Sequence, residues 1–278
     1  MKNYNADPNK KYPVKYVQGK LDSIDHAGNK ITVTDAEGAT SEVPYDVLVI
    51  STGATYVAPW RDAPDQLKSR VDRESDYTKA RAEIEAAGKV LIAGAGATGL
   101  EAAGYIKEKF PDKQVGVCLR GKTLLPYVTG AHAMVDAYMT KIGVKVHYGT
   151  PYTAETQATL GYDCTVNCMG YNFQGPKRFM TGDLANCLTE RGQIKVNQFG
   201  QVCEKNPLLI DQAPGADNGK VYPNVFSVGD VCFTPTAENK SIVSMYQYVP
   251  QVASNMYQVL CGSKPDCFKA IPLEFSHF

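Results

Sequence analysis

Residues 89–106, KVLIAGAGATGLEAAGYI, decide the fold of this chain. The apolar run at 89–93 is typical of a buried strand, and a helical pattern begins after the glycines at 94–99. A GxGxxG turn between a strand and a helix brings backbone N–H groups and the helix N-terminus toward an anion, typically a dinucleotide pyrophosphate. The stretch therefore predicts a Rossmann-type unit with its phosphate site at Gly94, Gly96, Thr98 and Gly99. The alternative is an inherited turn that binds nothing.

The second half of the dinucleotide fingerprint is missing. Sites for NAD usually carry an acid about 20 residues after the glycines, to accept from the ribose hydroxyls. Leu119 takes that position here, followed by Arg120 and with Lys122 near. A cation suits a 2′-phosphate and favours NADP, so Arg120 is a candidate ligand. It could equally be a solvated charge at the end of a strand.

Predicted helices and strands alternate on either side of the glycine turn. Asp76–Ala87 and Ala131–Lys141 have helical patterns, as does the segment through Leu100–Phe110. Apolar runs predict strands at 114–119, 144–148 and 164–168. Strands that alternate with helices in this way form a doubly wound parallel sheet, so the predicted fold class is α/β.

The remaining segments indicate a second, mixed domain. Alternating residues at 14–17, 30–34 and 41–44, separated by turn residues, predict a three-stranded antiparallel meander. Buried strands are predicted at 45–50, 193–196 and 225–228, and a final helix at 240–260. We therefore divide the chain into 1–75 and 172–278, which form one interrupted domain, and 76–171, the Rossmann-like domain inserted in it.

Composition excludes several classes of protein. The 278 residues carry 29 basic and 29 acidic side chains, which argues against a nucleic-acid partner. The eight cysteines have neither CxxC nor zinc-type spacing, so we expect no metal site and mainly buried thiols in a reducing compartment. No apolar run approaches the roughly 20 residues of a membrane helix. We expect a soluble or peripherally attached protein without a visible import sequence.

Four motifs together resemble the pyridine-nucleotide flavin oxidoreductases. Residues 45–53 resemble the strand and "ATG" turn of their flavin domain, and 89–106 their NAD(P)H domain. Residues 164–170 resemble the second "ATG" turn, and 224–230 the second flavin motif. The absence of a CxxxxC disulfide, with Lys240 and Asn255 on the last helix, places the resemblance nearest the apoptosis-inducing-factor-like, ferroptosis-suppressor and type II NADH:quinone oxidoreductase branch.

The resemblance implies FAD and NAD(P)H as cofactors and a role for each motif. The glycine turn and Gly170 would hold the nicotinamide dinucleotide; Thr52, Gly53, Gly229 and Asp230 would hold the flavin. Glu101 near the nicotinamide and Lys240 near the isoalloxazine are the candidate catalytic residues. Glu101 could instead be an acid favoured by the helix dipole, Asp230 a turn residue and Lys240 a solvated charge.

The chain departs from these relatives at its start. The residues before Val14 cannot form a βαβ unit of about 30 residues, so we expect the first half of the flavin domain to be absent. The predicted function is an NAD(P)H oxidoreductase that passes hydride to flavin and then to a quinone, incomplete as a single chain. The alternatives are a degenerate structural subunit and an NAD(P)H-sensing module. We expect a hetero-oligomer, mitochondrial or cytoplasmic, in which another chain covers the incomplete domain.

Overall fold

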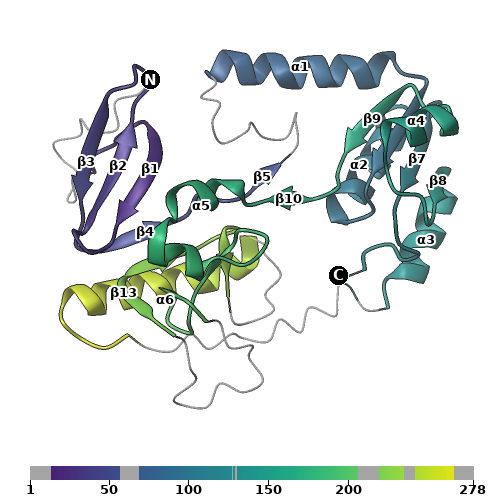
Figure 1. Cartoon of the computed structure of the whole chain (residues 1–278). Coiled ribbons are helices and arrows are strands. Elements are labelled where there is room, and N and C mark those ends of the chain that lie inside the picture. The colour runs from purple at the N-terminus through teal and green to yellow at the C-terminus, as the bar shows by residue number, and fades with distance from the viewer. Residues whose placement is uncertain are drawn as a thin grey trace. The chain divides into compact units, whose positions relative to one another are not determined.

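The computed structural model describes residues 14–56, 69–126, 128, 130–205, 219–234 and 242–265 (Figure 1). Two compact units divide the chain: residues 55–171 form one, and residues 1–54 with 172–278 form the other. The first crossing therefore lies at 54/55, whereas the sequence predicts it at residue 75. Short strands β5 (Thr55–Tyr56) and β10 (Tyr171–Asn172) pair with each other where the chain crosses between the units.

The unit of residues 55–171 contains a four-stranded parallel sheet, ordered β8 (Val144–His147), β7 (Gln114–Cys118), β6 (Lys89–Ala93) and β9 (Cys164–Asn167). The chain starts at β6, moves outward through β7 and β8, and returns to the other side of β6 for β9. This order confirms the predicted doubly wound sheet. The central strands β6 and β7 are buried along most of their length, as expected of a parallel sheet, whereas β8 and β9 at its two edges are partly exposed.

Among the described residues of this unit, four helices accompany the sheet. Helix α2 (Ala97–Lys109) packs on β6 and β7, and α3 (His132–Lys141) on β8. Helix α1 (Arg70–Ala86) begins earlier than predicted because Ser69 and Asp72 form a reciprocal capping box. Helix α4 (Ala154–Leu160) is absent from the sequence prediction; it is short, and the side chain of its N-cap Thr153 and a left-handed Gly161 bound it.

The other unit begins with the meander β1 (Lys20–Asp25), β2 (Lys30–Thr34) and β3 (Thr40–Pro44). The three-stranded antiparallel prediction is confirmed, but its first strand was placed wrongly at 14–17. The reason is the tight turn before β2, where the Asp25 carboxylate accepts from the Gly28 N–H at 2.9 Å. Asn29 has φ 49°, so the hairpin closes with Asp25 opposite Lys30. The strand that precedes this turn is therefore 20–25.

A second sheet in this unit is ordered β12 (Gln201–Cys203), β13 (Val221–Ser227) and β4 (Leu48–Ile50). Strands β13 and β4 are parallel although more than half of the chain separates them. The last helix, α6 (Ile242–Leu260), packs on β13 and contains Pro250. The core between them is formed by Phe226 of β13, Val228 just after it, and Tyr248 and Val252 of α6.

Smaller elements complete this unit: α5 (Gln174–Phe179), the 3₁₀ helix η1 (Gly182–Cys187), and β11 (Ile194–Lys195) paired in parallel with β14 (Cys232–Phe233). Within the described ranges, no helix has the length and hydropathy needed to cross a bilayer. In the same ranges, no group of three metal-ligating side chains comes together.

Candidate functional site

The glycine turn lies where the direction of strand addition reverses. It follows β6, whose two neighbours in the sheet are β7 on one side and β9 on the other. In doubly wound sheets, ligands bind in the crevice outside the carboxyl ends of the strands at this switch point. The position that the sequence predicts for a phosphate site is therefore the position that the topology favours.

Two of the glycines have no room for a side chain. Gly94 has φ 112°, and a Cβ atom on it would lie 2.5 Å from the Cys168 carbonyl oxygen. A Cβ atom on Gly99 would lie 2.0 Å from the Gly94 carbonyl oxygen. Backbone hydrogen bonds hold these segments together: the Gly94 N–H donates to Cys118 O at 2.9 Å, and Cys168 N–H donates to Ala93 O at 2.8 Å. Glycine at 94 and 99 thus lets the turn, β9 and α2 approach closely.

The N-terminus of α2 differs from those of α1 and α4. Ser69 and Thr153 cap the latter two with their side chains, whereas the N-cap of α2 is Gly96, with no side-chain cap and no acid in the first turn. A helix start carries partial positive charge from its N–H groups. Together with the exposed Thr98, this end of α2 offers the surroundings that a pyrophosphate requires.

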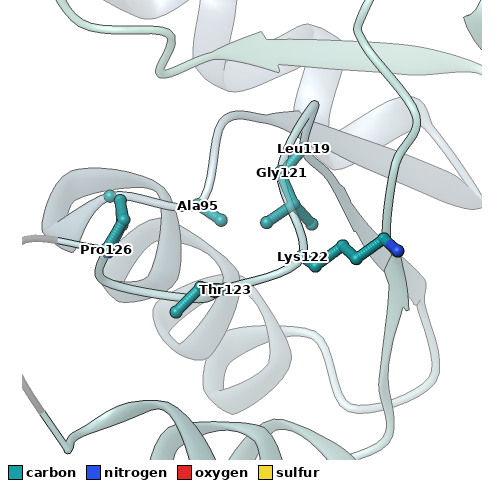
Figure 2. Close-up of a pocket in the computed structure, with 7 residues that line it drawn as sticks. Ala95, Leu119, Gly121, Lys122, Thr123 and Pro126 are labelled. Carbon is teal, nitrogen blue, oxygen red and sulfur yellow. The ribbon is translucent and has the colours of Figure 1, made fainter.

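A cavity of about 270 Å³ lies beside the turn (Figure 2). Ala95 and Gly96 line it on one side, and Leu119, residues 121–123 and Pro126 on the other. The two sides are tied together, because Leu125 N–H donates to Ala95 O at 3.1 Å. The cavity therefore joins the carboxyl ends of β6 and β7, where the adenosine half of a dinucleotide would lie.

In the loop after β7, the cation that lines the cavity is not the one that the sequence predicts. Leu119 is 8% exposed and supplies no polar side chain. Arg120, the predicted 2′-phosphate ligand, is exposed and does not line the cavity, whereas Lys122 and Thr123 do. Thr123 and Pro126 are not among the residues predicted for this site. No motif marks them; they reach the site only because the loop folds back toward Ala95.

The candidate catalytic residue Glu101 is exposed on α2. With Thr98 it lines a larger cavity, of about 910 Å³, bounded by α1, α2 and β9. Apolar and aromatic side chains, among them Ile84 and Tyr105, form much of its wall. Gly170 has φ 91° and follows β9. Because β9 is parallel to β6, Gly170 lies at the same carboxyl end of the sheet as the glycine turn. The residues predicted to hold the nicotinamide dinucleotide, Gly94–Gly99 and Gly170, therefore lie together at the carboxyl end of the sheet. Glu101 lies on α2, one helical turn after its first residue, Ala97.

The predicted flavin residues lie together in the other unit. Thr52 and Gly53 follow β4, and Gly229 and Asp230 follow β13. The two strands are parallel and adjacent, and their ends are joined because Val228 N–H donates to Ile50 O at 3.1 Å. Both glycines have positive φ, 68° and 79°. The half-buried Asp230 carboxylate and the exposed Thr52 therefore lie at the carboxyl ends of these two parallel strands, where their oxygens can accept hydrogen bonds from ligand hydroxyls.

This edge fits only part of a flavin dinucleotide. The cradle for a pyrophosphate, a GxGxxG turn followed by a helix, occurs once in the sequence and belongs to β6. Lys240, predicted near the isoalloxazine, lies outside the described residues. Asn255 is fully buried: its Nδ2 donates to Phe199 O at 2.9 Å, and its Oδ1 accepts from Gln251 Nε2. Asn255 therefore anchors α6 to the loop before β12.

The described cysteines are all free thiols: Cys118, Cys164, Cys168, Cys187, Cys203, Cys232 and Cys261. Cys168 lies against the glycine turn, where burial raises the pKa of its thiol to about 11. Burial also raises the pKa of Cys164, at the opposite end of β9. A thiol attacks as its thiolate, so neither residue is poised for disulfide chemistry at neutral pH.

Comparisons with known proteins agree with this geometry. The sequence profile described as "Pyridine nucleotide-disulphide oxidoreductase" matches residues 9–258. The chain is 23% identical to the FAD-dependent oxidoreductase FVFD30 of Flammulina velutipes, covering 88% of this chain and 72% of that protein. It is also 23% identical to the type II NADH:quinone oxidoreductase of Staphylococcus aureus, covering 94% of this chain and 69% of that one.

Solved structures share the fold. A pyridine nucleotide-disulfide family oxidoreductase from Enterococcus faecalis superposes with a TM-score of 0.61 at 20% identity. The match covers 90% of this chain but 56% of the other, so this chain spans little more than half its length. FAD and NAD(P)H, the cofactors implied by the sequence resemblance, are those of the family. With the switch-point glycine turn and the profile match over most of its length, the chain belongs to the pyridine nucleotide-disulphide oxidoreductase family.

Proposed function

We propose that this chain binds a nicotinamide dinucleotide at residues 94–99 and acts as the nucleotide-binding part of a FAD-dependent NAD(P)H oxidoreductase that reduces a quinone. One observation carries the proposal: the glycine turn occupies the switch point with Cβ-excluding contacts at Gly94 and Gly99. The quinone acceptor is supported by the resemblance to the type II NADH:quinone oxidoreductase.

The residues present divide the work of binding. The start of α2 and the Gly96 backbone would face the pyrophosphate, and the loop at 119–126 would enclose the adenosine. Gly170 and Glu101 would lie toward the nicotinamide, while Thr52 and Asp230 would accept from flavin hydroxyls. Nicotinamide and flavin supply the hydride transfer themselves, and the protein supplies binding and orientation.

Flavin retention would depend on contacts beyond those that this edge supplies. The flavin-type edge holds Thr52, Gly53, Gly229 and Asp230 without the glycine-rich pyrophosphate cradle. A large share of dinucleotide affinity comes from such a cradle. We therefore propose a hetero-oligomer in which a partner contributes the remaining flavin contacts. The same observation supports a second candidate function, an accessory subunit that keeps nucleotide binding without turnover.

The test is an anaerobic titration of the purified protein, with whatever co-purifies, using NADH and NADPH. A bound flavin shows as a visible absorption band, and its bleaching by either nucleotide supports the oxidoreductase. Nucleotide binding without a flavin band supports the accessory subunit. Binding itself is followed by the fluorescence of the reduced nicotinamide.

Two glycine variants make the binding test specific. Gly96→Val places a branched side chain at the phosphate approach and is expected to abolish nucleotide binding. Gly104→Val is the matched control, because it lies in the same helix, where an added Cβ meets nothing within 4 Å. Unchanged nucleotide affinity in Gly96→Val would refute the proposed site.

A further inference from the structure

His132 holds the loop that lines the cavity beside the glycine turn. It is the first residue of α3, and its Nδ1 accepts a hydrogen bond from Leu124 N–H at 3.2 Å. Leu124 directly follows Lys122 and Thr123, which line the cavity (Figure 2), and its own side chain is fully buried. The imidazole therefore anchors the backbone of the cavity loop, residues 119–126, to α3.

The next residue connects this anchor to the glycine turn. Leu125 N–H donates to Ala95 O at 3.1 Å, and Ala95 lies between the first two glycines of the turn. Leu125 has φ 45°, an uncommon backbone conformation for a residue other than glycine. Such strained positions persist only where the surroundings enforce them. The contact at Leu124 N–H therefore helps to keep the cavity loop against the segment that would face a pyrophosphate.

The hydrogen bond at Leu124 requires a neutral histidine. A ring nitrogen of histidine accepts only when it carries no proton, and in the imidazolium both ring nitrogens are donors. Protonation of His132 would therefore place an N–H group against the Leu124 N–H group. A buried backbone donor that loses its acceptor costs free energy. The anchored form of the cavity loop is therefore the form with a neutral His132.

The groups around His132 oppose one another in their effect on its charge. The start of α3 disfavours a cation, because a helix N-terminus carries partial positive charge, and Lys122 adds positive charge from the cavity loop. Asp136 favours a cation, because residues four apart lie on one face of a helix. A protonated His132 therefore has a carboxylate on its own helix as an alternative to the loop.

Tyr148, just after β8, connects this carboxylate to the imidazole. Its hydroxyl donates to Asp136 Oδ1, and its ring lies edge-on to the His132 ring, with the centroids 5.9 Å apart. Burial and the contact with Asp136 raise the pKa of Tyr148 to about 12, so the phenol keeps its proton near neutral pH. Of the groups in this cluster, His132 is therefore the one whose charge changes near neutral pH.

We propose that His132 is a positioning residue that makes nucleotide binding depend on pH, because it anchors the cavity loop only while its imidazole is neutral. The inference rests on the proposed nucleotide site, whose adenosine half this loop would enclose. Histidine side chains change charge between about pH 5 and pH 8. Affinity is highest above this change, where the loop is anchored, and weakens as the pH falls through it.

The experiment measures the binding of ADP-ribose to the full chain by calorimetry, from about pH 8 to about pH 5.5. ADP-ribose carries the adenosine and pyrophosphate of the dinucleotide, and its charge does not change in this range. Wild-type affinity is expected to weaken about 5- to 30-fold toward the acid end, the range of one hydrogen bond lost by a buried donor. His132→Asn, whose amide oxygen accepts without titrating, is expected to bind equally at every pH. His132→Leu, without an acceptor, is expected to bind weakly throughout.

His147→Gln is the matched control. His147 belongs to the same compact unit, but its Nε2 lies 2.9 Å from the Tyr162 hydroxyl oxygen, and its replacement is expected to leave the wild-type pH profile of binding unchanged. Urea denaturation at each pH verifies that every protein is folded, and His132→Asn alone decides the test if His132→Leu does not fold.

The outcomes separate this inference from the function on which it rests. Tight binding by the wild-type chain that does not vary with pH would overturn the role of His132 and leave the nucleotide site standing. The same holds for a His132→Asn protein that keeps the wild-type pH profile, or a His147→Gln protein that loses it. If ADP-ribose binds at no pH, the proposed nucleotide site itself fails, and the inference fails with it.

Discussion

At the scale of single residues, the site depends on glycines at two positions where no side chain would fit. A Cβ atom on Gly99 would lie 2.0 Å from the Gly94 carbonyl oxygen, and one on Gly94 would lie 2.5 Å from Cys168 O. The glycine turn, the first turn of α2 and the end of β9 are therefore packed backbone against backbone. Any side chain at these two positions must push one of the three segments away.

Gly99→Ala tests this packing directly. A Cβ atom 2.0 Å from a backbone oxygen forces α2 away from the turn, which should lower the free energy of unfolding by about 1–3 kcal/mol and weaken NADH binding. Urea denaturation and NADH titration measure the two effects. Gly104→Ala, in open space on the same helix, should be neutral or stabilising by up to about 1 kcal/mol. A Gly99→Ala protein as stable as wild type would contradict the close approach.

The cysteines allow a second test at this scale. Cys261 is exposed, whereas Cys187 and Cys203 are fully buried and burial raises the pKa of each thiol to about 12. Alkylation of the native protein at pH 8 should therefore modify Cys261 first, and the buried pair only after unfolding. Peptide mass spectrometry in a Cys267→Ser background measures the order. Labelling of Cys187 as fast as Cys261 would show that the core around it opens.

At the scale of elements, two parts of the nucleotide-binding unit depend on polar contacts. Helix α1 has no buried residue, and polar contacts stabilise its start: the capping box between Ser69 and Asp72 and the Arg70–Glu74 ion pair. The strand β8 carries His147, whose Nε2 lies 2.9 Å from the Tyr162 hydroxyl oxygen at the edge of the sheet. Each contact can be removed without touching the glycine turn.

Ser69→Ala should destabilise the start of α1. It removes the Oγ that accepts from Asp72 N–H at 3.2 Å, a contact worth about 1 kcal/mol. Amide hydrogen exchange in the first turns of α1 should then become faster, with no change in β6. Ser69→Thr keeps the acceptor and should exchange like wild type. Equal exchange in all three proteins would mean that other contacts, such as the Arg70–Glu74 ion pair, hold the helix start in place of the cap.

His147 makes the stability of the sheet depend on pH. Burial lowers its pKa below the ordinary 6.5, and Lys145 adds to the effect. The unfolded chain therefore binds the proton at higher pH, and the contribution of His147 is present above about pH 6.5 and lost as the pH falls through the lowered folded pKa. Urea midpoints measured from pH 7 to pH 5 should fall more steeply for wild type than for His147→Gln. Parallel curves would exclude this group as the cause.

At the scale of the whole molecule, the two compact units should respond differently to nucleotide. Binding to the folded state stabilises it by about 2.7 kcal/mol when the ligand is present at 100 times its Kd. Because the glycine turn and its cavity belong to residues 55–171, we expect NADPH to slow hydrogen exchange there, most of all around 94–126. Exchange mass spectrometry measures this. Protection confined to 242–260 would place the nucleotide in the other unit.

The sequence predicted those elements that local patterns encode. The central strands β6 and β7 are apolar runs because both faces of the sheet are buried there, and the glycine turn is visible because close backbone approach leaves no other residue type. Weaker elements escaped prediction: α4 is short, and the first strand of the meander was misplaced because the hairpin turn at 25–30, rather than the alternation at 14–17, sets its register.

Local sequence patterns were therefore enough to predict the α/β class, the alternation of strands with helices and the candidate phosphate site, since each depends on residues close together in the chain. The position of the cation that lines the cavity could be read only from the folded chain, because Arg120 and Lys122 are indistinguishable until the loop folds back on Ala95. The tertiary structure also decided that the turns after β4 and β13 share an edge, since parallel pairing joins segments far apart in sequence. Contacts between residues far apart in the chain arise from packing and leave no pattern in the neighbouring sequence.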